Sequence, residues 1–165
     1  MENPPLSRFV ELCADRVKNT GTKEFVAWMK ELKMMMQRSK AVYPPEDPEF
    51  AKQFMKIVEF YVNGRITKLR ALETMRGFLS KLQDAEQFLD ENNFWRITDE
   101  AAIDKMVEEV LAKNEKLLEK ALAGHAKSLT RLRNLVVDTS MKRIDIQQAE
   151  TAVMARLTKM KDVSR

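Results

Sequence analysis

Apolar residues recur along the chain at intervals of three and four, the spacing of one face of an α-helix. The first such stripe, Leu6 to Val17, predicts a helix over about 6–19, and the next predicts one over about 23–40. Seven further helical stretches follow between residues 50 and 160. No stretch of useful length alternates apolar and polar residues, the pattern of a half-buried strand. We therefore expect eight or nine helices and no sheet.

Composition favours the same fold class. Leu, Ala, Lys, Glu and Met are common, while four Gly and five Pro are too few for the many turns of a sandwich or barrel. We expect an all-α protein of two packed small helical bundles preceded by an N-terminal helical hairpin. Residues 43–48, Tyr-Pro-Pro-Glu-Asp-Pro, are interpreted as a stiff spacer after the hairpin, with a polyproline ligand as the alternative. The expected divisions are 1–45, 46–96 and 97–165.

Several classes of protein are excluded. The single cysteine, Cys13, rules out an internal disulfide and a cysteine-rich zinc site, and its place on an apolar helical face predicts a core position. No apolar run approaches the roughly 18 residues that span a bilayer, so we expect no membrane span. The first residues, Met1 to Pro5, fit neither a signal peptide nor a convincing transit peptide, with a transit peptide missing from this sequence as the alternative.

Catalytic patterns are missing from the sequence. His125, the one histidine, follows Gly124 at an expected helix end, where a capping or surface residue is typical. Glu108 and Glu109 point about 100° apart on a helix and cannot jointly hold a metal or a water. There is no His-Glu-x-x-His, glycine-rich phosphate loop or nucleophile elbow. We expect no enzyme activity, no catalytic residue, no metal, no cofactor and no small-molecule substrate.

Charge is segregated along the chain although the net value is only +4. Residues 98–123 carry a net −3, whereas residues 124–165 carry nine Lys and Arg against four Asp and Glu, a net +5. Such a basic segment can contact phosphates without reading base sequence. A solvated face, or a face that meets an acidic protein, is the alternative. The candidate RNA-binding residues are Lys127, Arg131, Lys142 and Arg143.

The residues from Ile97 onward resemble the GatB/YqeY family. Residues 97–100 (ITDE) and 107–114 (VEEVLAKN) are similar to its I-x-D-E and E-V-L-A-x-N patterns. Gly124 with Lys127 is similar to its glycine followed by K-x-K. Upstream, residues 63–67 (NGRIT) look like a turn in the helical domain of the B subunit of the tRNA-dependent amidotransferase. The resemblance covers about 50–157.

The resemblance implies a two-lobed, all-helical tail, which in the amidotransferase grips the outer part of a tRNA while another domain performs the chemistry. Residues 1–45 do not look like that catalytic domain. Four places depart from the family pattern, and the first is His125, which replaces the first Lys after Gly124. Asn134 stands where the family has a glycine, Asp138 stands where it has a lysine, and residues 141–143 (MKR) replace a Lys-Gly-Lys loop.

Two functions are weighed. The first is a non-catalytic binding module that contacts tRNA or rRNA within a translation-related assembly. The second is a structural accessory subunit of a large complex, for example a mitochondrial one, which uses the fold for contacts with protein partners. The second function predicts exposed apolar surface around Phe94, Trp95 or Met34. The expected location is the mitochondrial matrix or a bacterial-type cytoplasm.

Overall fold

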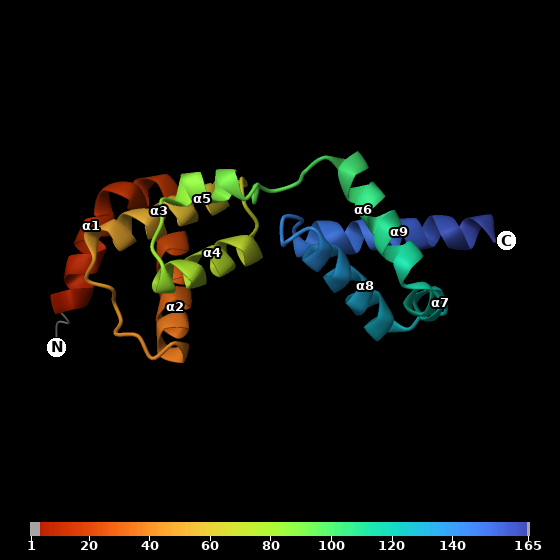
Figure 1. Ribbon diagram of the computed structural model, residues 1–165, viewed down its shortest axis with the longest axis horizontal. Coiled ribbons are helices and arrows are strands. Elements are labelled where there is room, and N and C mark those ends of the chain that lie inside the picture. Colours follow the sequence, from red (N-terminus) through yellow and green to blue (C-terminus); the bar gives the residue numbers. More distant parts are fainter. Residues whose placement is uncertain (1–3, 165) are drawn as a thin grey trace. The chain divides into compact units, whose positions relative to one another are not determined.

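The protein is built of α-helices and loops throughout the part that the computed structural model describes, residues 4–164 (Figure 1). This confirms the all-α fold class. The helices of the described residues are α1 (Pro4–Thr20), α2 (Thr22–Arg38), α3 (Pro48–Val62), α4 (Lys68–Ser80), α5 (Ala85–Glu91), α6 (Glu100–Lys113), α7 (Glu115–Leu122), α8 (Ala126–Thr139) and α9 (Ile146–Val163). Within residues 4–164, no helix combines the length and the apolar character that a membrane span requires. Two parts of the sequence lie outside the described residues. They are residues 1–3, which belong to the segment compared with signal and transit peptides, and Arg165, the last residue of the basic segment.

The helices form two compact units, α1–α5 and α6–α9. In the first unit α1 packs along α3, and α2 contacts both α3 and α4. The two helices of the expected N-terminal hairpin therefore share a core with the helices that follow the proline-rich segment. The finer division into 1–45, 46–96 and 97–165 remains a prediction.

Aromatic residues build much of the core of the first unit. The ring centres of Phe9 and Phe54 lie 5.7 Å apart, and Trp28 meets Tyr61 edge-on at 5.2 Å. Tilted and edge-on rings at these distances are favourable pairs. Cys13 is fully buried, as predicted, and burial raises the pKa of its thiol to about 12. A thiol with that pKa stays protonated at neutral pH and is a poor nucleophile.

Polar side chains define where helices of this unit begin. The Asp47 carboxylate accepts a hydrogen bond from the Glu49 N–H, which caps α3. The buried Gln53 of α3 accepts a hydrogen bond of 2.8 Å from the Ala85 N–H at the start of α5. Gln53 therefore satisfies a donor that the start of a helix would otherwise leave unpaired.

The second unit is a small bundle in which α6, α8 and α9 contact one another and α7 packs against all three. Its core consists of apolar residues from the inward faces of these helices and from the loop before α9. Its buried residues include Ile103, Val107, Leu132, Val136, Ile144 and Val153. Because α6 and α8 turn their apolar faces into this core, their polar faces point outward.

The connecting segment before α6 is held by the loop before α9. The Ile97 N–H donates to the Arg143 carbonyl, and the Arg143 Nε donates to the Trp95 carbonyl, both at 2.9 Å. Trp95 is half-buried and Phe94 is buried, so the expectation of an exposed apolar surface at Phe94 is wrong. Met34 in the first unit is 44% exposed, as that hypothesis predicts.

Candidate nucleic-acid interface

The basic helix α8 begins directly after a tight turn. Gly124 adopts a φ of +92°, a conformation that glycine reaches without steric cost. His125 follows as the residue that precedes α8, and its Nδ1 lies 2.9 Å from the hydroxyl of the buried Ser128. His125 is exposed, which confirms its prediction as a capping or surface residue.

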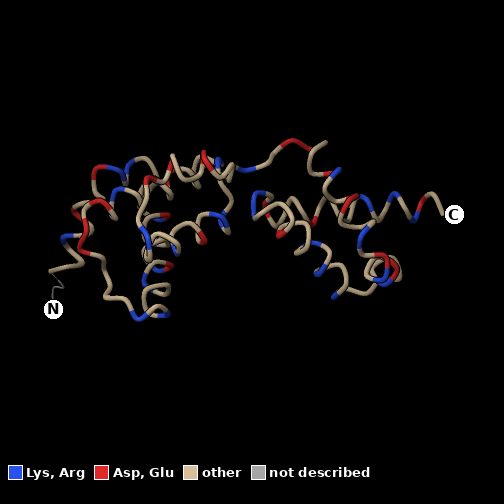
Figure 2. Tube along the Cα trace, in the orientation of Figure 1, with Lys and Arg blue, Asp and Glu red and all other residues tan. Residues whose placement is uncertain are grey.

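Lys127 and Arg131 lie on the outer face of α8. The inner face buries Ser128, Leu132, Val136 and Val137. Lys127 and Arg131 are both exposed and one helical turn apart, about 6 Å along the axis. Figure 2 shows Lys and Arg positions along this helix. Two of the predicted RNA-binding residues are therefore side by side and open to solvent.

The same face changes character toward the end of α8. Asn134 and Asp138 continue the line of Lys127 and Arg131, and both are exposed. Arg133 lies on the flank of the helix, where its Nη1 is 3.7 Å from the carboxylate of Glu150. The outer face is therefore cationic in its first half only.

Lys142 and Arg143 lie beyond the other end of α8, in the loop that leads to α9. Met141 and Lys142 adopt φ values of +58° and +62°, and their N–H groups donate to the carbonyls of Asp138 and Val137. Lys142 and Arg143 are half-buried, and Arg143 bonds Trp95 as described above. In the structure Arg143 thus has a positioning role that spacing alone does not reveal.

The four predicted residues do not converge on one point. Lys127 lies in the first turn of α8, and residue 139 ends it, a separation of about 18 Å along the axis. Lys142 and Arg143 follow that end. The structure therefore brings the residues together as two pairs, one at each end of α8.

A small groove lies beside the first pair. It has a volume of about 240 Å³ and lies where the α7–α8 turn meets the second half of α9. Apolar walls come from Leu129, Met154 and Leu157, and Lys161 lines the rim together with His125. Lys161 is not among the residues selected from the sequence, because nothing in the spacing places α9 beside the start of α8.

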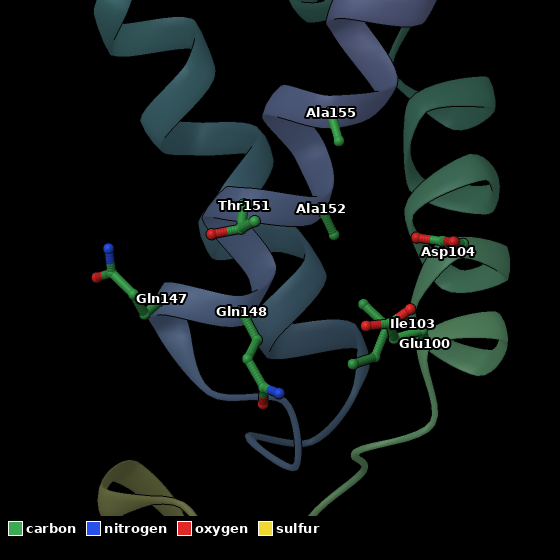
Figure 3. Close-up of a pocket in the computed structure, with 8 residues that line it drawn as sticks. All are labelled: Glu100, Ile103, Asp104, Gln147, Gln148, Thr151, Ala152 and Ala155. Atoms are coloured by element: carbon green, nitrogen blue, oxygen red, sulfur yellow. The ribbon is translucent and has the colours of Figure 1, made fainter.

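A larger groove of about 380 Å³ lies between α6 and α9 at the first half of each helix. Figure 3 shows Ile103 and Asp104 pointing from α6 toward α9, and Ala152 pointing back from α9. The lining residues are Glu100, Ile103, Asp104, Gln147, Gln148, Thr151, Ala152 and Ala155. Sequence reasoning missed this groove, although two of its features are visible in the sequence. Glu100 and Asp104 are one turn apart, and the facing helix carries small alanines.

No group of three or more His, Cys, Asp and Glu side chains between residues 4 and 164 is arranged to hold a metal ion. The acidic neighbours Glu108 and Glu109 belong to no such group. Glu108 pairs instead with Arg156, at 3.6 Å between carboxylate oxygen and guanidinium nitrogen. The candidate binding features of the second unit are therefore its charged helix faces and its two grooves.

Comparison with known proteins places these observations in a family. The sequence profile of the GatB domain matches residues 8–157. That range is wider than the resemblance at 50–157, because it also includes most of α1 and all of α2.

Two relatives are each named as the B subunit of the aspartyl/glutamyl-tRNA(Asn/Gln) amidotransferase, from Neisseria gonorrhoeae strains NCCP11945 and ATCC 700825 / FA 1090. Each is 27% identical over 114 residues, which are 69% of this chain and 23% of the relative. The chain therefore matches about a quarter of the length of these relatives. The matched domain is the non-catalytic helical part of GatB-like proteins. On the match of its GatB domain over residues 8–157, the chain belongs to the GatB/YqeY family.

Proposed function

We propose that this chain is a non-catalytic helical module that contacts the phosphate backbone of a tRNA or rRNA within a translation-related assembly. The observation that carries the proposal is the exposed pair Lys127 and Arg131, one turn apart on the outer face of α8. The names of the two relatives include aspartyl/glutamyl-tRNA(Asn/Gln), which supports a tRNA as the RNA.

The chemistry of α8 favours contact with phosphates over contact with bases. Lys and Arg neutralise phosphates and release counterions, which gives affinity that falls with salt and does not depend on base sequence. Binding to unpaired bases usually adds aromatic side chains on which the bases stack. Residues 124–165 contain no Phe, Trp or Tyr. We therefore expect binding to the phosphate backbone of the RNA that does not depend on base sequence.

The second cationic pair extends the proposed contact. Lys142 and Arg143 follow the far end of α8, which lies about 12 Å along the axis beyond Arg131, the nearer member of the first pair. That distance exceeds the reach of a single phosphate group. In this proposal the pairs contact different nucleotides, and α8 lies along the RNA strand.

The test is the affinity of a tRNA(Gln) transcript for a Lys127→Ala/Arg131→Ala variant, measured by fluorescence anisotropy at low salt. Loss of two phosphate contacts is expected to weaken binding about tenfold. The matched control is Lys116→Ala/Lys120→Ala, because these lysines are also exposed, also four residues apart, and on the neighbouring helix α7. An equal loss in both variants, or no affinity of the wild type, contradicts the proposal.

The second candidate is an accessory subunit that makes protein contacts, and one observation favours it. The groove between α6 and α9 has an apolar floor and is separate from the residues proposed to contact RNA. The two functions are compatible, because α6 and α8 offer different surfaces. Co-purification of a partner at fixed stoichiometry that is lost when the groove is filled is the measurement that distinguishes them.

A further inference from the structure

The groove between α6 and α9 has an acidic rim. Glu100 and Asp104 are exposed and stand one turn apart on the side of α6 that lines it. From Asp99 to Lys113 the chain carries five Asp and Glu against two Lys. Figure 2 shows acidic positions at the start of α6. This surface repels phosphate and attracts cations, the opposite of the outer face of α8.

The floor of the groove is apolar and narrow. Ile103 is 5% exposed, and the facing residues Ala152 and Ala155 are small, so α9 leaves space beside it. The lining residues of α9 run from Gln147 to Ala155, about 12 Å along the helix axis. That length corresponds to about two turns of a helix lying in the groove.

The polar groups of α9 border the groove on the other side. Gln147 and Thr151 are exposed at the rim. The Gln148 Oε1 accepts a hydrogen bond of 2.8 Å from Arg96 Nη2, which fixes that side chain. The groove therefore has one carboxylate rim, an apolar floor and a second rim of uncharged polar side chains, with the Arg96 guanidinium bonded to Gln148 of that rim.

We propose that this groove binds a basic amphipathic helix of a protein partner. An apolar side chain of that helix packs on Ile103 and Ala152, and a Lys or Arg on its flank lies at Glu100 and Asp104. Charge complementarity selects the occupant, because the apolar floor needs an apolar anchor and the two carboxylates need a cation beside it. Helices that lay an apolar face into such grooves are a recurring mode of recognition. The inference does not depend on the proposed contact with RNA.

The probe is a synthetic helical peptide of about 14 residues with Leu at i and i+4 and Arg at i+3 and i+7, which places Arg on one flank of the Leu pair. Its affinity for the full chain is measured by fluorescence anisotropy, and its location by amide chemical shifts. We expect saturable binding with shifts confined to α6 and α9. A peptide with Glu in place of both Arg is expected to bind at least about tenfold more weakly.

Two variants test the two halves of the groove. Glu100→Gln/Asp104→Asn is expected to weaken peptide binding about tenfold because it removes the acidic rim. Its matched control, Glu115→Gln/Glu119→Gln, removes an exposed pair of the same spacing that also begins in the first turn of its helix. Ala155→Phe fills the groove from an exposed position and is expected to abolish binding while the thermal unfolding midpoint stays unchanged.

The inference is overturned by an absence of peptide binding to the wild type, by equal weakening in both double variants, or by chemical-shift changes that map outside α6 and α9. Self-association of the wild type that Ala155→Phe removes also overturns it, because the occupant is then a second copy of the chain. The tRNA affinity of Lys127→Ala/Arg131→Ala is measured separately. A failure at the groove therefore leaves the RNA proposal standing, and the reverse also holds.

Discussion

The helices α6 and α8 are a matched pair with opposite surfaces. Each has 14 residues, and each packs against the other and against α9. Each buries four residues at helical spacing, from Ile103 to Leu111 in α6 and from Ser128 to Val137 in α8. Their outer faces differ, because α6 presents Glu100 and Asp104 while α8 presents Lys127 and Arg131.

This comparison separates two kinds of information in the sequence. The apolar positions of α6 and α8 specify where the helices pack, and both sets do so in the same way. The polar positions do not decide the fold, and they determine which partner each surface can accept. A family fold can therefore keep its core while its surfaces take different roles.

The largest expected effect is on the free energy of unfolding, and it comes from a substitution in the apolar core that α6 and α8 share. Leu132 of α8 is fully buried, and Leu132→Ala is expected to lower the free energy of unfolding by about 2–5 kcal/mol, since it removes apolar contacts and leaves a cavity. Urea unfolding followed by circular dichroism measures this change. Met154→Ala on α9 is the control, because Met154 is 50% exposed and its loss is expected to change stability by less than about 0.5 kcal/mol. Equal losses in the two variants contradict the assigned core.

A smaller effect is expected at the loop that ends α8. Lys142 has a φ of +62°, where a side chain is strained, so Lys142→Gly is expected to raise the free energy of unfolding by about 0.5–1 kcal/mol. Lys142→Ala loses the same charge but keeps the strain, and no gain is expected from it. The difference between the two variants in urea unfolding isolates the backbone contribution. If the two variants have equal free energies of unfolding, the backbone at residue 142 is not strained and the prediction is wrong. The resemblance places a family glycine at this position.

Much of the fold follows from the apolar stripes. The apolar stripe of α3 consists of Phe50, Phe54, Ile57, Val58 and Tyr61, and all of these are buried except Tyr61, which is half-buried. The start of α8 was harder to predict, because its first apolar stripe residue is Leu129 and the helix begins at Ala126. Only Lys127 and Ser128 of its first turn are polar, and neither extends the apolar stripe. Ser128 is buried there through its bond with His125, a contact that hydrophobic periodicity does not signal.

The sequence predicts the candidate sites only where their residues are close together along the chain. Lys127 and Arg131 share a face because they are four residues apart, and the structure places both in solvent. The bond from Arg143 to Trp95 joins residues 48 positions apart, and the groove joins α6 to α9. Such contacts arise from the packing of distant helices, so no short-range spacing reveals them.

The central claim is that α8, and not α6, faces the phosphate backbone. The most direct test is the salt dependence of tRNA(Gln) affinity for the wild type, Lys127→Ala/Arg131→Ala and Glu100→Gln/Asp104→Asn. Loss of two phosphate contacts is expected to reduce the slope of log K against log salt by about 1.5 in the α8 variant. The α6 variant is expected to keep the wild-type slope. An unchanged slope in the α8 variant, or an equal reduction in both variants, would contradict this claim.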